Sequence, residues 1–244
     1  MHRAERQLTP SDQIHAGEWL IAELAPFSAL TVASLLPARF AAYARILHPA
    51  GLRREAAVQP VRWAVVAAAS GRSVHAAVNW DLISDTAVDT APPWDHEPDS
   101  GSLPVAEAAV LADVLQRHTR TGDRCWFGVW DGFGGLAPYV GNVLDVPCRS
   151  MRLLVGPVDA ATTSLITGPG HQSANLWWPE DRSWCVATDI DLRSTFIGGS
   201  QSCIQEILSH PALEAWSVRP SQRIAGDADD LNTSSSPAAE GTPC

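Results

Sequence analysis

Residues 175–191 carry the clearest pattern in the chain, and they read Asn175-Leu176-Trp177-Trp178-Pro179-Glu180-Asp181-Arg182-Ser183-Trp184-Cys185-Val186-Ala187-Thr188-Asp189-Ile190-Asp191. With the two-residue period of a strand, one face consists of Trp184, Val186, Thr188, Ile190 and Leu192. The opposite face consists of Cys185, Ala187, Asp189 and Asp191. The first face is typical of a core, and the second is small and then acidic. We therefore predict a strand that leaves the interior and reaches solvent at its end.

Outside this segment, short apolar runs and turn residues predict further strands and helices. Strands are expected over residues 31–36, 62–69, 73–80, 125–130 and 149–155. Helices are expected over residues 13–24, 37–47 and 104–118, and in a segment that Ser200 or Ser202 would cap. The helix over residues 37–47 would bury a stripe formed by Phe40, Tyr43, Ala44 and Leu47.

These elements predict an α+β fold. The expected architecture is a single domain with a mostly antiparallel sheet of four or five strands and three or four packed helices. We assign residues 1–12 to a flexible N-terminus and residues 13–219 to the single domain. Residues 220–244 contain almost no large apolar side chains, so we expect a disordered C-terminal tail.

The composition limits the classes of partner. A net charge of −10 and scattered arginines argue against nucleic-acid binding, which needs a clustered basic surface. The sequence contains no run of about 18 apolar residues, so no membrane span is predicted. The polar first residues do not resemble a secretory signal. The five cysteines are widely spaced and odd in number, which favours free thiols in the cytoplasm. The oligomeric state is left open.

The tryptophan-rich segment is the best candidate for a binding surface. We predict binding by Trp177, Trp178, Asp181, Arg182, Asp189 and Asp191, because aromatic rings combined with charges are typical of interaction surfaces. Taken one by one, tryptophans are more often core residues, in which case residues 179–182 form only an exposed turn.

Asp189 and Asp191 also suggest a divalent metal, because two carboxylates on one face offer hard oxygen ligands. The sequence has none of the common metal-ligand spacings, so solvated or arginine-paired acids are the preferred interpretation, with Arg193 or Arg182 as the partner. No metal ligand and no catalytic residue are assigned. The chain has no lysine, which excludes a P-loop and a pyridoxal-phosphate site, and no cofactor is predicted.

Three blocks of the sequence resemble a family of actinobacterial proteins. The blocks are residues 37–50, 125–134 and 177–191, and the resemblance extends over most of residues 19–219. This resemblance implies no particular activity.

A fainter resemblance is to the SUKH superfamily, whose α+β proteins include immunity proteins that neutralise toxins. It rests on Leu36-Pro37 before the segment Phe40–Tyr43, and on a tryptophan-bearing strand that follows a turn. The long loop over residues 85–104 departs from this pattern.

The sequence therefore predicts a non-catalytic module that binds a protein partner, with an immunity-like role implied by the second resemblance. Two alternatives stay open. One is a metal-dependent hydrolase that uses Asp189 and Asp191, with Asp131 or a histidine brought close by the fold. The other is a module that binds a small molecule or a sugar.

Overall fold

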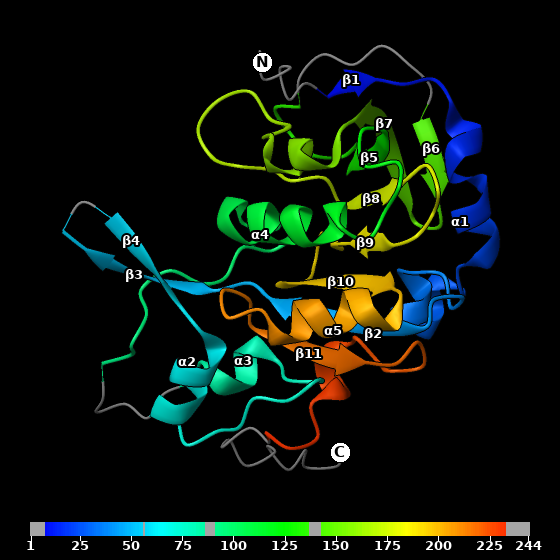
Figure 1. Cartoon of the computed structure of the whole chain (residues 1–244). Coiled ribbons are helices and arrows are strands. Elements are labelled where there is room, and N and C mark those ends of the chain that lie inside the picture. The colour runs from blue at the N-terminus through cyan, green and yellow to red at the C-terminus, as the bar shows by residue number, and fades with distance from the viewer. Residues whose placement is uncertain (1–7, 56, 86–90, 137–142, 233–244) are drawn as a thin grey trace, which may run out of the picture.

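The computed structural model describes residues 8–55, 57–85, 91–136 and 143–232. Within these ranges the chain forms one nine-stranded antiparallel sheet and a separate two-stranded hairpin (Figure 1). The predicted sheet of four or five strands is therefore wrong. Several short strands contribute only two to four residues, too few to show an alternating pattern in the sequence.

The large sheet has the order β1-β7-β5-β8-β9-β10-β2-β11, and β6 pairs with β7 beside β1. Its strands are β1 (Thr9–Pro10), β2 (Ala42–Leu47), β5 (Cys125–Trp130), β6 (Val143–Val146), β7 (Arg149–Gly156), β8 (Leu176–Pro179), β9 (Cys185–Ala187), β10 (Ser194–Gly199) and β11 (Ala215–Val218). The hairpin consists of β3 (Ala50–Arg54) and β4 (Ala57–Val61).

Among the described residues there are five α-helices, against the three or four predicted. They are α1 (Glu18–Glu23), α2 (Trp63–Ala69), α3 (Trp80–Ile83), α4 (Val105–Gln116) and α5 (Gln201–Ser209). Short 3₁₀ helices are η1 (Ile14–Gly17), η2 (Phe27–Ala29), η3 (Val32–Ser34), η4 (Val158–Thr162) and η5 (Gly226–Ala228). None of the described helices is both long and apolar enough to cross a lipid bilayer.

Both faces of the sheet are covered. Helices α4 and α5 lie side by side on one face, where Leu111, Ile204 and Val186 belong to one buried cluster (Figure 1). The opposite face carries a second cluster that includes Trp178 and Phe196 together with Trp19 of α1. A third cluster, centred on Trp63 and Trp80, joins α2 and α3 to the hairpin. Strands between two covered faces read as continuously apolar, which hides the two-residue period.

Two predicted elements have the opposite type. Residues 42–47, expected in a helix, form strand β2, which pairs with both β10 and β11. Residues 62–69, expected to form a strand, contain helix α2 instead. A short apolar run does not distinguish a buried strand from a buried helix, and alanine, which fills much of α2, favours the helix.

The central segment keeps its alternation but ends early. Trp184 and Val186 face the α4–α5 side, whereas Cys185 and Ala187 face the opposite cluster, as the two-residue period predicts. The strand β9 stops at Ala187, so the predicted continuation to Leu192 is wrong. Residues 189–192 form a turn in which Leu192 N–H donates to the carbonyl of Asp189.

Several expectations are confirmed. The predicted helix over residues 104–118 is α4, and the strands over residues 125–130 and 149–155 are β5 and β7. The predicted strands over residues 31–36 and 73–80 are absent from the described structure, where these segments contain η3 and the start of α3.

The chain termini are more ordered than predicted where they are described. Thr9 and Pro10, assigned to the flexible N-terminus, form β1 on the edge of β7. Residues 220–232, assigned to the disordered tail, pack on the body of the protein and bury Asp229 and Asn232. Residues 1–7 and 233–244 lie outside the described residues.

Helix α5 supplies a test of local structure. The Ser200 hydroxyl accepts a hydrogen bond from Cys203 N–H at 3.2 Å, so Ser200 is the N-cap and Ser202 is not. We predict that Ser200→Ala lowers the free energy of unfolding by about 1 kcal/mol, because one N–H of the first turn loses its acceptor.

Urea denaturation measures this loss, and Ser202→Ala is the matched control, expected to change stability by less than about 0.5 kcal/mol. Equal losses in the two variants would contradict the assignment of the cap.

Candidate functional site

Trp177 and Trp178 do not form the predicted binding surface. Both belong to β8, and only 2% and 1% of their surfaces are exposed. Trp177 stacks on Phe127 with ring centroids 5.8 Å apart, and Trp178 packs in the cluster on the other face of the sheet. The two tryptophans are therefore core residues, and their place in a ligand-facing cluster is corrected.

Asp181 has a structural role in the turn between β8 and β9. Its carboxylate accepts hydrogen bonds of 2.9 Å from the Thr119 hydroxyl and from Arg120 N–H. Partial burial alone would raise the pKa of Asp181, but these bonds and those from Ser183 lower it. Arg182 lies on the surface with its guanidinium 5.3 Å from the ring centroid of Trp19. Neither side chain lies beside Asp189 and Asp191 in the cavity described below.

Asp189 and Asp191 are brought together, and both contact the same arginine. Arg149 Nη2 lies 3.4 Å from Asp189 Oδ1 and 2.9 Å from Asp191 Oδ2. The acids are thus paired with an arginine, as predicted, but the partner is Arg149 and not Arg193 or Arg182. Among the described residues, no group of three or more histidine, cysteine or acidic side chains is placed to hold a metal ion.

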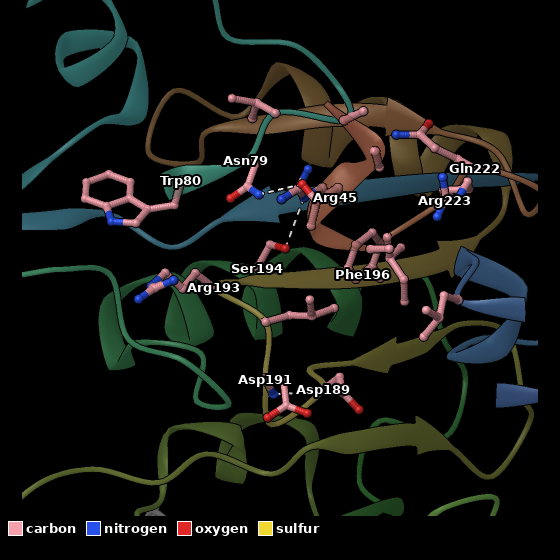
Figure 2. A pocket seen from close by; sticks show the side chains of 18 of the residues that line it. Arg45, Asn79, Trp80, Asp189, Asp191, Arg193, Ser194, Phe196, Gln222 and Arg223 are labelled. Atoms are coloured by element: carbon pink, nitrogen blue, oxygen red, sulfur yellow. Dashed lines mark hydrogen bonds between the residues drawn. The ribbon is translucent and has the colours of Figure 1, made fainter. Parts of the chain in front are cut away.

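The two acids lie at one end of a cavity of about 380 Å³ on the sheet face opposite α4 and α5. We call it the Arg45 cavity. It lies between β2, β10, the segment 76–81 and the C-terminal segment 222–228. Its apolar walls include Phe27, Leu30, Trp63, Trp80, Leu192, Phe196 and Ile224. Figure 2 shows Asp189 and Asp191 together, apart from Arg45, which lies next to Ser194.

Strand alternation places Arg45 in this cavity. Ala44 and Ile46 of β2 face the α4–α5 cluster, so Arg45 faces the other side of the sheet. Its Nε donates to the Ser194 hydroxyl and its Nη1 to the Ala76 carbonyl, both at 3.0 Å. The guanidinium also lies 5.8 Å from the ring centroid of Trp63 and 5.9 Å from that of Phe196.

Arg45 has no carboxylate within ion-pair distance among the described residues. Burial lowers the pKa of Arg45 to about 10, and the negative charge of Asp229 acts in the opposite direction. The side chain therefore keeps its positive charge at neutral pH, although it is mostly buried.

The other arginines that line the cavity are neutralised. Arg193 forms ion pairs with Asp81 at 3.3 Å and with Glu97 at 2.6 Å. Arg223 pairs with Asp227 at 2.8 Å. Of the described cavity-lining cations, Arg45 is thus the one without a carboxylate contact.

Asp229 fixes the C-terminal segment that closes one side of the cavity. Its side chain is fully buried and accepts hydrogen bonds from His75 Nε2 at 2.8 Å and from Asn79 N–H at 2.9 Å. Asn232 donates to it from its backbone at 3.0 Å and from its side chain at 2.9 Å. These contacts attach residues 226–232 to the segment before α3.

The enzyme alternative gains no support from the residues named for it. Asp131 pairs with Arg152, and neither Asp131 nor a histidine lines the Arg45 cavity in the described parts of the chain. His48 is buried and contacts the Asp99 carbonyl and the Thr195 hydroxyl. Burial lowers the pKa of His48 to about 4, so its ring is neutral at pH 7.

The buried thiols are equally unsuited to catalysis. Burial raises the pKa of both Cys125 and Cys203 to about 12, and it also raises the pKa of Cys185. The thiolate is the reactive form, so these side chains behave as apolar core residues, as predicted for Cys185 and Cys203.

Comparisons of the chain with protein families, with characterised proteins and with solved structures find no match. The sequence did not predict the Arg45 cavity, because the segment that contains Arg45 was expected to form a helix over residues 37–47 and not a strand. The signal that could have found it is an arginine inside an otherwise apolar strand, Ala42–Leu47.

The contacts of Asp229 predict a dependence of stability on pH. Burial would raise the pKa of Asp229, but the hydrogen bonds from Asn232, Asn79 and His75 lower it below the usual value. The ionised carboxylate therefore stabilises the folded state at pH values above its unfolded pKa, and this contribution is lost as the pH falls through the folded pKa.

We predict that Asp229→Asn lowers the free energy of unfolding by about 2 kcal/mol at neutral pH, because the variant loses charged hydrogen bonds. Urea denaturation between about pH 3 and pH 7 should show this difference shrinking as the pH falls. Asp227→Asn is the matched control, because Asp227 is exposed and pairs only with Arg223 on the surface. A difference that is constant with pH would contradict the role of the Asp229 charge.

Proposed function

We propose that this protein binds a small organic molecule in the Arg45 cavity. The observation that carries the proposal is a space of about 380 Å³ whose walls are formed by segments far apart in the sequence. This volume lies at the small end of the range typical of ligand pockets. A ligand of modest size is therefore expected.

The chemistry of the walls supports this function. Ligand pockets are mostly apolar and contain a few polar groups that orient the ligand. Here Phe27, Leu192 and Ile224 supply accessible apolar surface, and Asn79 and Gln222 supply amides. The carboxylates of Asp189 and Asp191 add polar groups at one end. This combination corresponds to the small-molecule alternative of the sequence analysis.

A protein-binding surface centred on Trp177 and Trp178 is less well supported. Both rings are buried in the core, and exposing either of them to a partner would disrupt the fold. Metal-dependent hydrolysis by Asp189 and Asp191 is less well supported too, because Arg149 occupies the place beside both carboxylates that a cation would take.

The proposed setting of this binding is the cytoplasm. Cys125, Cys185 and Cys203 are free thiols in the core, which is compatible with a reducing compartment.

A fragment screen tests the proposal. We predict that small aromatic compounds raise the thermal unfolding temperature and change the tryptophan fluorescence, because Trp63 and Trp80 line the cavity. Ala228→Phe places a ring in the cavity and should weaken the binding of these compounds about tenfold or more.

The matched control is Ala109→Phe, which introduces the same ring at an exposed position of α4, away from the cavity. Binding that survives in Ala228→Phe as well as in the control would contradict the Arg45 cavity as the site, and a screen in which no compound binds would contradict the function.

A further inference from the structure

Resting on the proposed function, we infer that the ligand is a small organic anion whose single carboxylate binds the guanidinium of Arg45, with an apolar body against Phe27, Leu192 and Ile224.

The guanidinium of Arg45 is only partly hydrogen-bonded. A guanidinium has five N–H donors, and the described residues accept only two of them, at Ser194 and Ala76. Nη2 has no hydrogen-bond partner among the described residues, yet it is not one of the buried, unsatisfied nitrogen atoms. It therefore reaches open space, and the space beside it is the cavity.

The charge of Arg45 also points to an anionic ligand. A buried charge without a bonded counter-charge is costly, so an anion that enters the cavity gains more from Arg45 than it would from an exposed arginine. Asp229 acts on Arg45 only through space, because its own oxygens accept hydrogen bonds from His75, Asn79 and Asn232. A carboxylate from the ligand would complete the site.

The other charged side chains around the cavity limit the ligand to one negative charge. Arg193, Arg223 and Arg149 each have carboxylate partners in this protein, so they offer little attraction to a second anionic group. Asp189 and Asp191 share the single arginine Arg149, so the net negative charge at the other end repels such a group. A monocarboxylate fits this charge pattern better than a phosphate dianion does.

The accessible apolar walls of the cavity fit the body of such a ligand. The rings of Trp63 and Phe196 lie against the Arg45 guanidinium and are almost fully buried, so they support the arginine and do not contact the ligand. Phe27, Leu192 and Ile224 are partly exposed and line the same cavity, so the part of the ligand next to the carboxylate packs against them.

The test compares matched carboxylates and carboxamides by isothermal titration calorimetry. The probes are phenyl, indole and naphthyl propionates and the corresponding propanamides, which differ in charge and little in shape. The wild-type protein should bind the carboxylates about tenfold to a hundredfold more tightly, as expected for a charge-assisted hydrogen bond.

Arg45→Met should abolish this preference, because methionine keeps an unbranched side chain and removes the charge. Arg223→Met is the matched control, since Arg223 lines the same cavity but already pairs with Asp227, and it should keep the preference. If Arg45→Met does not fold, Arg45→Gln supplies the answer, because glutamine removes the charge but keeps N–H donors for Ser194 and Ala76, and it should lose the preference for the carboxylates.

Equal affinities of the paired probes for the wild-type protein, or a carboxylate preference that persists in Arg45→Met, would overturn the inference. If the fragment screen finds only neutral ligands that Ala228→Phe excludes, the anion assignment fails while the proposed function stands. If no compound of either screen binds, both fail.

Discussion

The buried guanidinium of Arg45 is the constraint on which this part of the structure depends. Its bonds to Ser194 and Ala76 connect β2 and β10 to the segment that precedes α3, and the rings of Trp63 and Phe196 flank it. A charged group in such a place must be compensated by polar contacts, aromatic faces and nearby opposite charge. Ser194, Ala76, Trp63 and Phe196 provide these contacts, and the remaining part of the guanidinium faces the cavity.

The C-terminal segment completes this arrangement through Asp229. Its fully buried carboxylate holds residues 226–232 by hydrogen bonds from Asn232, and it holds the segment before α3 by bonds from His75 and Asn79. The same negative charge favours the charged form of Arg45. One side chain thus closes a wall of the cavity and also makes the buried cation less costly. The fold and the proposed ligand site therefore share the charges of Asp229 and Arg45.

The sequence predicted elements whose signals are local and missed features that need distant partners. Helix α4 and the strands β5 and β7 have clear local patterns, whereas β2 has apolar residues on both faces, with Arg45 among them, and these residues also fit a helical stripe. The disorder expected for residues 220–232 was inferred from few apolar side chains, but their order comes from polar contacts of Asp229 and Asn232. Trp177 and Trp178 show that an aromatic cluster does not reveal by composition whether it lies in a core or on a surface. Asp189 and Asp191 do lie together, but in a turn and not on the predicted strand. The surroundings of Arg45 depend on the pairing of β2 with β10, which are about 150 positions apart in the chain, and no local pattern predicts that pairing.

The central claim is that an anionic group binds beside Arg45, and a crystal structure of the protein with a bromine-substituted phenylpropionate tests it most directly. The anomalous signal of bromine locates the ring independently of the carboxylate. The account predicts the ring inside the Arg45 cavity and a carboxylate oxygen about 2.7–3.2 Å from Nη2 of Arg45. A probe bound outside this cavity, or bound within it with its carboxylate turned away from Arg45, would contradict the account.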